Sequence, residues 1–285
     1  MFYRRYIPAP PLDALVACLW YSEGLEGVHA QERLLPNGES GIVLDLREEP
    51  VRIYDAQDAS RYTTHPPAVF CGARSGCFII DTSRQERVIG IQFYPGGSLP
   101  FFPMPASEVA NETYSLSDLW PHEADLLREE MLSASAAQSN RQAAEAAMFR
   151  ILERSLLTRL KDGATLAPAI QFAVRRLSRP GASPLGFNQP IQQLADQVGC
   201  SSRRFIQLFR DQTGLAPKTF QRVRRFQHVL QRLHVGTGKG WASLAAECGY
   251  YDQAHFIHDF RAFAGMTPGE YVLAATPHLN HVPLT

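Results

Sequence analysis

Two short stretches in the last third of the chain carry side chains that could read the base edges of double-stranded DNA. Arginine can pair bidentately with guanine, and glutamine with adenine, in the major groove. Isoleucine and alanine in the same stretches could make only apolar contact, for example with a thymine methyl group. The candidates for base contact are Arg203, Ile206, Gln207, Gln253, Ala254, His255 and His258.

A second set of polar and basic side chains flanks these stretches and could bind the phosphate backbone. Such contacts position a protein on DNA without specifying sequence. The alternative for each arginine is a solvated surface charge, and Arg224 and Arg225 could instead brace the two stretches against each other. The candidates for phosphate contact are Ser201, Ser202, Arg204, Arg210, Lys218, Arg222 and Thr267.

Both stretches belong to an internal repeat, residues 191–220 and 241–271. The offset between them is 50 residues up to the turn glycine and 51 from Phe205 and Phe256 onward. The matching pairs are Leu194 and Leu244, Ala195 and Ala245, Gly199 and Gly249, Phe209 and Phe260, Gly214 and Gly265, and Pro217 and Pro268. Two units in one register favour a repeated structural module over a generic helical bundle.

Each repeat has the residue pattern of a helix-turn-helix unit. A small residue in the first helix, Ala195 or Ala245, allows a second helix to cross closely. A glycine supplies the permissive backbone of the tight turn, and Ser202 or Asp252 is a good N-cap for the following helix. That helix is predicted to bury its phenylalanines and to expose its polar face.

Charge is distributed unevenly, although the formal net charge of the 285 residues is zero. Residues 1–165 hold 15 Lys and Arg against 22 Asp and Glu, whereas residues 166–285 hold 13 against 6. A basic C-terminal part indicates a polyanionic partner for that part alone.

The first 110 residues read as short strands separated by turns, at 41–46, 68–71, 77–81 and 88–94, which predicts a small barrel or sandwich. Helical periodicity follows at 121–135, 141–160 and 165–178. The helix at 141–160 could be a connector or dimerisation element, or could pack on its own domain. Residues 161–163 are a plausible boundary, 179–184 should end a helix, and the last ten residues should form a loose tail.

No catalytic set is recognisable in this N-terminal part. His29, His65 and His122 lack metal-ligand spacing, so no metal or cofactor is expected. The five cysteines form no CxxC pair, and Cys71 with Cys77 is a weak candidate for a redox pair or a reactive thiol. No long apolar segment is present, which favours a cytoplasmic protein without a membrane partner. Core packing accounts better than a pocket for Trp20, Tyr21, Phe93 and Tyr94.

Residues 166–275 resemble the DNA-binding domain of the AraC/XylS family. Residues 249–256 (GYYDQAHF) and 260–268 (FRAFAGMTP) closely match the signature of that family. The resemblance implies seven helices, a linker helix at about 217–233, and two recognition helices in adjacent major-groove segments.

Residues 1–160 resemble, less specifically, a domain of unknown function found ahead of some AraC-type DNA-binding domains. The similarity rests on Leu35-Pro36-Asn37-Gly38, residues 91–97 (IQFYPGG) and residues 105–109 (PASEV). It implies a cupin-like β domain that senses a small molecule or mediates association.

These observations predict an α+β protein with a β-rich domain and helical connector at 1–163, a tandem helix-turn-helix domain at 164–276 and a tail at 277–285. The expected function is a one-component, sequence-specific transcription regulator and not an enzyme. RNA polymerase is an expected partner if it activates, and a homodimer is left open. The alternatives are a constitutive DNA binder with an inert β domain, or a repair-type enzyme with a DNA-binding tail. The operator, the effector and the sign of regulation do not follow from the sequence.

Overall fold

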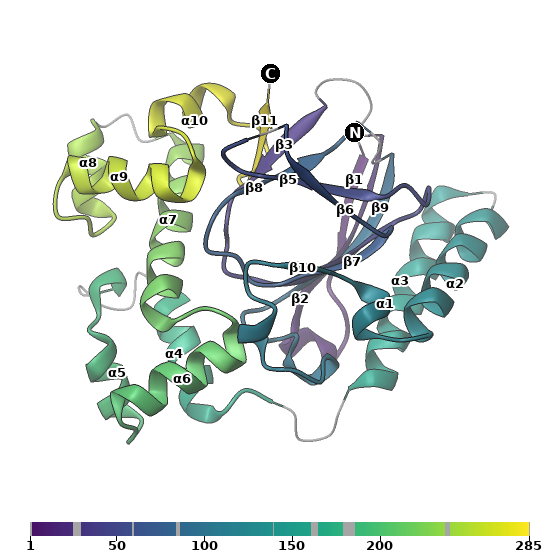
Figure 1. Ribbon diagram of the computed structural model, residues 1–285, viewed down its shortest axis with the longest axis horizontal. Helices are drawn as coiled ribbons and strands as arrows, with labels where there is room; N and C mark the ends of the chain where they lie inside the picture. Colours follow the sequence, from purple (N-terminus) through teal and green to yellow (C-terminus); the bar gives the residue numbers. More distant parts are fainter. Residues whose placement is uncertain are drawn as a thin grey trace.

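The computed structural model describes residues 2–24, 30–58, 60–83, 86–138, 140–160, 165–178, 186–236 and 240–284. The domain boundary expected at 161–163, the turn at 179–184 and His29 lie outside these residues. A β sandwich occupies the middle of the molecule, with helices α1–α3 on one side and α4–α10 on the other (Figure 1).

Two antiparallel sheets form the N-terminal domain, so of the two architectures expected it is the sandwich. The first sheet has the order β1 (Phe2–Tyr6), β2 (Val16–Glu23), β9 (Arg87–Phe93), β4 (Gly41–Asp45), β7 (Ala68–Cys71) and β10 (Thr113–Ser115). The second has the order β11 (His281–Leu284), β3 (Gln31–Leu34), β8 (Phe78–Asp81), β5 (Val51–Tyr54) and β6 (Tyr62–His65). The four strands expected from the sequence are confirmed as β4, β7, β8 and β9.

The first sheet is built around β9, which lies between β2 and β4. Ile89, Ile91 and Phe93 of this strand are at most 1% exposed and pack in the core of the sandwich. Gly90 is required here, because a Cβ atom would lie 2.4 Å from the Trp20 ring and 2.6 Å from the Ile42 carbonyl oxygen. Tyr21 is buried beside this core, whereas Tyr94 is exposed, so the four aromatic residues line no common pocket.

The connector consists of α1 (Leu116–Leu119), α2 (Glu123–Ala137) and α3 (Arg141–Arg159). Helix α3 starts at the Asn140 cap, whose side chain accepts a hydrogen bond from the Gln142 amide. Met148, Leu152 and Leu156 of α3 are fully buried in the sandwich core. Of the two roles left open for this helix, the structure shows packing on its own domain.

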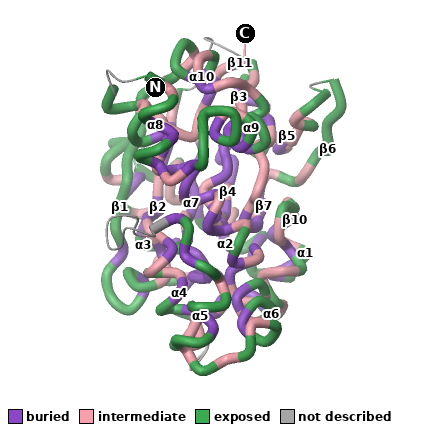
Figure 2. Tube along the Cα trace, turned by 90° about the vertical axis from the view of Figure 1, so that its left-hand side faces the viewer, coloured by how far each residue is buried: buried purple, intermediate pink, exposed green. Residues whose placement is uncertain are grey.

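The helical domain contains α4 (Pro168–Ser178), α5 (Ile191–Gln197), α6 (Ser202–Thr213), α7 (Pro217–Val235), α8 (Trp241–Glu247), α9 (Gln253–Ala264) and α10 (Pro268–Ala274). These are the seven helices that the resemblance implies, and α7 is the linker helix. Its central part is buried, whereas the outer turns of α5 and α6 are exposed (Figure 2). Phenylalanines from α6, α7 and α9 form one core, with Phe226 of α7 edge-on to Phe260 of α9 at 5.2 Å between ring centroids.

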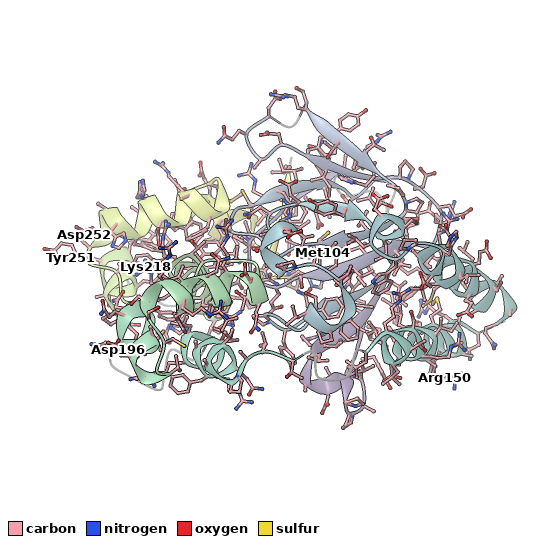
Figure 3. The ribbon with its side chains drawn as sticks, turned by 60° about the horizontal axis from the view of Figure 1, so that its bottom comes forward. Met104, Arg150, Asp196, Lys218, Tyr251 and Asp252 are labelled. Carbon is pink, nitrogen blue, oxygen red and sulfur yellow. The ribbon has the colours of Figure 1, made fainter. Side chains whose placement is uncertain are left out.

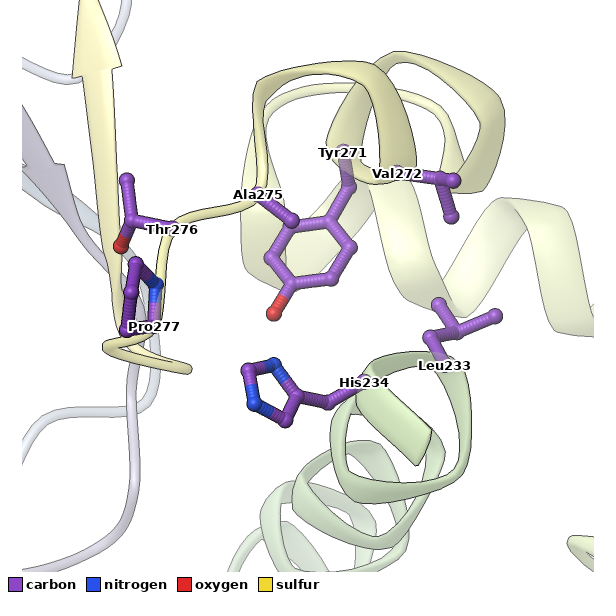
Figure 4. Close-up of a pocket in the computed structure, with 7 residues that line it drawn as sticks. All are labelled: Leu233, His234, Tyr271, Val272, Ala275, Thr276 and Pro277. Carbon is purple, nitrogen blue, oxygen red and sulfur yellow. The ribbon is translucent and has the colours of Figure 1, made fainter. Parts of the chain in front are cut away.

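The expectation of a loose tail is wrong. After α10 the chain crosses to the sandwich, where His281–Leu284 pairs antiparallel with β3. Val282 is 1% exposed, and the His281 Nδ1 atom lies 2.7 Å from the Glu32 carboxylate. Figure 4 shows the start of this segment, and the Tyr271 hydroxyl donates a hydrogen bond of 2.9 Å to the Leu279 carbonyl further along it. A hollow of about 390 Å³ lies here, lined by Leu233, His234, Tyr271, Val272, Ala275, Thr276 and Pro277.

The helical domain also docks on the sandwich through the middle of α7. The Gln227 side chain donates a hydrogen bond of 2.8 Å to the Pro36 carbonyl, and the Arg224 guanidinium one of 3.3 Å to the Asn37 carbonyl. Gly38 has a φ of +76°, and a Cβ atom there would lie 3.2 Å from the Phe220 ring. The Leu35-Pro36-Asn37-Gly38 motif is therefore the seat of the linker helix.

Candidate nucleic-acid interface

The first helix-turn-helix unit consists of α5 and α6. Ala195 at their crossing is fully buried, and Gly199 in the turn has a φ of +68°, as the sequence predicts. The N-cap of α6 is Ser201, whose hydroxyl accepts a hydrogen bond from the Arg204 amide, rather than the predicted Ser202. The helix begins one residue earlier than expected because the residue before Ser202 is an equally good cap.

The second unit consists of α8 and α9 and repeats this geometry. Ala245 is 1% exposed and Gly249 has a φ of +77°. The predicted cap is confirmed, because the Asp252 carboxylate accepts a hydrogen bond of 2.7 Å from the His255 amide. Gly265 ends α9 in the left-handed conformation, which only glycine adopts without strain.

A buried carboxylate joins the linker helix to the second recognition helix. Asp259 of α9 is 2% exposed and accepts hydrogen bonds from Arg222 and Arg225 of α7. Arg225 also lies 4.2 Å from the Tyr250 ring centroid. Arg225 therefore braces α7 against the second unit, whereas Arg224 lies 3.7 Å from the Glu39 carboxylate of the β domain.

The outward faces of α6 and α9 carry the candidates for base contact. All seven of these side chains are exposed, including the apolar Ile206 at 41%. The opposite faces, with Phe205, Phe209, Phe256 and Phe260, are fully buried. Figure 3 shows Asp196, Lys218, Tyr251 and Asp252 gathered at one end of the molecule, with Arg150 of α3 at the other.

The candidates for phosphate contact differ in how far their polar groups are already engaged. Arg204, Arg210 and Lys218 are exposed. The Thr267 hydroxyl belongs to a capping box with Glu270 at the start of α10, and the Arg222 guanidinium binds Asp259. Phosphate contact by each of the seven residues stays a prediction.

A carboxylate that the sequence interpretation missed holds one of the candidates for base contact. The amide nitrogen of Gln207 lies 2.9 Å from both carboxylate oxygens of Asp211, one helical turn further along α6. The Ser107 hydroxyl, from the 3-10 helix Ala106–Glu108 of the β domain, donates a hydrogen bond of 2.9 Å to the same carboxylate. The i, i+4 spacing of Gln207 and Asp211 was a usable signal, but Ser107 lies 104 residues away along the chain.

Tyr251 was also missed. It is 92% exposed at the turn before α9 and its amide donates to the His255 Nδ1 atom at 3.4 Å. An exposed aromatic residue directly ahead of a recognition helix is a further candidate for DNA contact.

The β domain offers weak support for an enzyme. Burial raises the pKa of both the Cys71 and the Cys77 thiols, which keeps them protonated and poorly nucleophilic. Among the described residues no group of three or more His, Cys, Asp or Glu side chains is placed to hold a metal ion. A shallow polar hollow of about 330 Å³ lies beside the β5–β6 hairpin, with Arg74, Tyr54 and Tyr62 in its lining. In the part of the chain that the structure describes, no helix is long and apolar enough to cross a bilayer.

Two family models match separate parts of the chain. Residues 4–115 match a domain of unknown function (DUF6597), and residues 194–273 match a helix-turn-helix domain. No curated protein matches the sequence significantly.

Solved structures of transcription regulators are similar in fold at low identity. Apo ToxT from Vibrio cholerae strain SCE256 is 11% identical with a TM-score of 0.46, and the match covers 90% of this chain and 98% of ToxT. A DNA-binding transcriptional dual regulator from Escherichia coli K-12 is 22% identical with a TM-score of 0.30, over 38% of this chain and 94% of that protein. The C-terminal domain of AraT, a response regulator from Geobacillus stearothermophilus, is 16% identical with a TM-score of 0.35, over 40% of this chain and 90% of that domain.

Proposed function

We propose that this chain, a DNA-binding transcription regulator of the AraC type rather than an enzyme, reads two short elements of one operator with its two recognition helices. The observation that carries the proposal is the repeat in three dimensions. Two units with the same turn glycine and the same buried faces present α6 and α9 with polar outward faces, and one continuous helix, α7, joins them.

The outward side chains divide into readers and anchors. Arg203 suits a guanine edge, Gln253 suits an adenine edge, and Ile206 suits a thymine methyl group. Lys218, Arg204 and Arg210 supply positive charge at the ends of the same surface, where phosphates of the flanking backbone would lie. Since both units belong to one chain, one molecule suffices to bind two elements.

The test is capture of fragmented genomic DNA on the purified full-length protein at about physiological salt, where non-specific binding is weak. We expect enriched sites with two elements about one helical turn, or roughly 10 bp, apart. Arg203→Ala should abolish the preference in one element and Gln253→Ala in the other. Arg150→Ala, which removes an exposed arginine from α3, is the matched control and should leave both elements unchanged.

Regulation through the β domain is the second part of the proposal. That domain touches the first unit at α6, the linker helix at α7 and the second unit at α9, where the Arg33 guanidinium donates a hydrogen bond of 3.0 Å to the Ala264 carbonyl. A small molecule or a second protomer that moves the β domain would therefore change how both units are presented.

A thermal-shift screen against metabolites tests this regulation, because a ligand that binds the native state raises the melting temperature. A compound that raises the melting temperature and changes DNA capture supports a sensor. Unchanged melting and capture across the library would favour the constitutive binder.

A further inference from the structure

Gln207 is presented to solvent with a defined polarity, and Asp211 defines it. A carboxylate only accepts hydrogen bonds, so the atom of the Gln207 amide that faces it must be the NH₂ group. That nitrogen lies 2.9 Å from each oxygen of the carboxylate. The side-chain oxygen of Gln207 is therefore the group left for a base.

A single outward acceptor has a specific meaning in the major groove. Adenine and cytosine each present an amino donor there, at N6 and N4, whereas guanine N7 and O6 and thymine O4 are acceptors. A glutamine free to turn its amide could satisfy either class of base. With its nitrogen held by Asp211, Gln207 should favour adenine or cytosine and disfavour guanine and thymine.

The Asp211 carboxylate is itself fixed from the other domain. Besides the Ser107 hydroxyl, the packing around it leaves little freedom, because α6 contacts the 3-10 helix Ala106–Glu108. Gly214 at the end of α6 has a φ of +89°, and a Cβ atom there would lie 3.2 Å from the Ala73 Cβ and 3.3 Å from the Ala106 carbonyl oxygen. The end of the first recognition helix is thus seated on the β domain at the point where Ser107 meets Asp211.

We propose that Asp211 is a specificity-determining residue that holds Gln207 with its amide oxygen toward DNA, and that Ser107 of the β domain is its positioning partner. Neither residue needs to touch DNA for this role. The proposal rests on the proposed function, because it requires Gln207 to face a base. It links the β domain to the base preference of the first unit through two hydrogen-bonded contacts.

The experiment is selection from a randomised DNA library with the full-length protein, followed by sequencing. The position that Gln207→Ala alters is assigned to Gln207. At this position the wild-type protein should enrich adenine or cytosine over guanine and thymine about tenfold, in line with the discrimination of one good base contact. Asp211→Asn, which keeps the shape but can offer either an oxygen or an NH₂ group, should reduce the preference to less than about threefold. Preferences at the other positions should persist.

Three further variants separate positioning from a general effect on charge or folding. Asp196→Asn removes the same charge from an exposed site of α5 in the same unit and should keep the wild-type preference. Ser107→Ala, which lies outside the helical domain, should relax the preference at the Gln207 position alone. Ser107→Thr, which retains the hydroxyl, should restore it.

The outcomes distinguish this inference from the function on which it rests. If the wild-type protein enriches no motif, both fail. If Gln207→Ala changes one position but Asp211→Asn leaves the preference there intact, the inference is overturned and the proposed function stands. A wild-type preference for guanine or thymine at that position, or an equal loss at every position in Asp211→Asn, would also overturn it.

Discussion

Asp259 should be the residue on which the stability of the second unit depends most. It is 2% exposed in α9, and it accepts hydrogen bonds of 3.1 Å from Arg222 Nε and 2.9 Å from Arg225 Nη2 of the linker helix. Replacing Asp259 by asparagine keeps the size of the side chain but removes the charge. The two guanidinium groups would then lack their common counter-ion.

The magnitude follows from the unequal burial of the two arginines. The Arg225 side chain is 7% exposed and that of Arg222 is 38% exposed. Breaking a buried ion pair by removing one partner costs about 3–5 kcal/mol. Arg225 keeps the Asn188 side-chain oxygen at 3.2 Å, and asparagine keeps one acceptor, so for Asp259→Asn we expect about 2–4 kcal/mol. Arg222→Ala should cost less than about 1 kcal/mol, because solvent screens its half-exposed charge.

Urea unfolding followed by circular dichroism measures both changes at neutral pH. Asp196→Asn is the matched control and should stay within about 0.5 kcal/mol of the wild-type protein, as exposed substitutions do. The reasoning fails if Asp259→Asn is equally mild, or if Arg222→Ala is as costly as Asp259→Asn. DNA binding of Arg222→Ala at several salt concentrations adds a separate result. A salt slope smaller by about 0.9 would assign Arg222 to a phosphate, and an unchanged slope would leave it the brace alone.

Three other predictions concern single side chains. Lys218→Ala should weaken binding to all DNA sequences alike and reduce the salt slope by about 0.9; a changed base preference would contradict its role as a phosphate contact. Val282→Ala in β11 should lower the free energy of unfolding by about 2 kcal/mol, measured in urea, because it removes buried methyl groups. Val235→Ala, at a site that is 86% exposed, should change it little, and equal effects would mean that the β11 strand does not hold. Burial lowers the pKa of His228 below 6.5, so the native state binds fewer protons than the unfolded state and this residue should cost stability as the pH falls below about 6.5. His228→Gln should therefore lose less stability than the wild-type protein between pH 7.5 and 5.5 in urea titrations, and parallel curves would exclude this contribution.

The helix-turn-helix units could be predicted from the sequence because their determinants are local. A small residue at the crossing, a glycine at the turn and a cap before the second helix lie within about a dozen residues in each unit, and the repeat shows them twice. The burial of Phe205 and Phe256 follows from helical periodicity alone. Even here the exact cap of α6 was missed, because Ser201 and Ser202 are chemically alike and only the backbone geometry separates them.

The contacts that join the two domains were decided only by the tertiary structure. Residues 281–284 read as a tail, since a four-residue segment with a proline has little strand signal of its own. It becomes a strand because β3, about 250 residues away in sequence, presents a free edge beside the end of α10. Ser107 and Asp211 are equally ordinary in sequence, and they meet because α6 docks on the β domain. Local periodicity thus determined the DNA-reading surfaces, whereas long-range docking determined what holds them and which polar atoms they present.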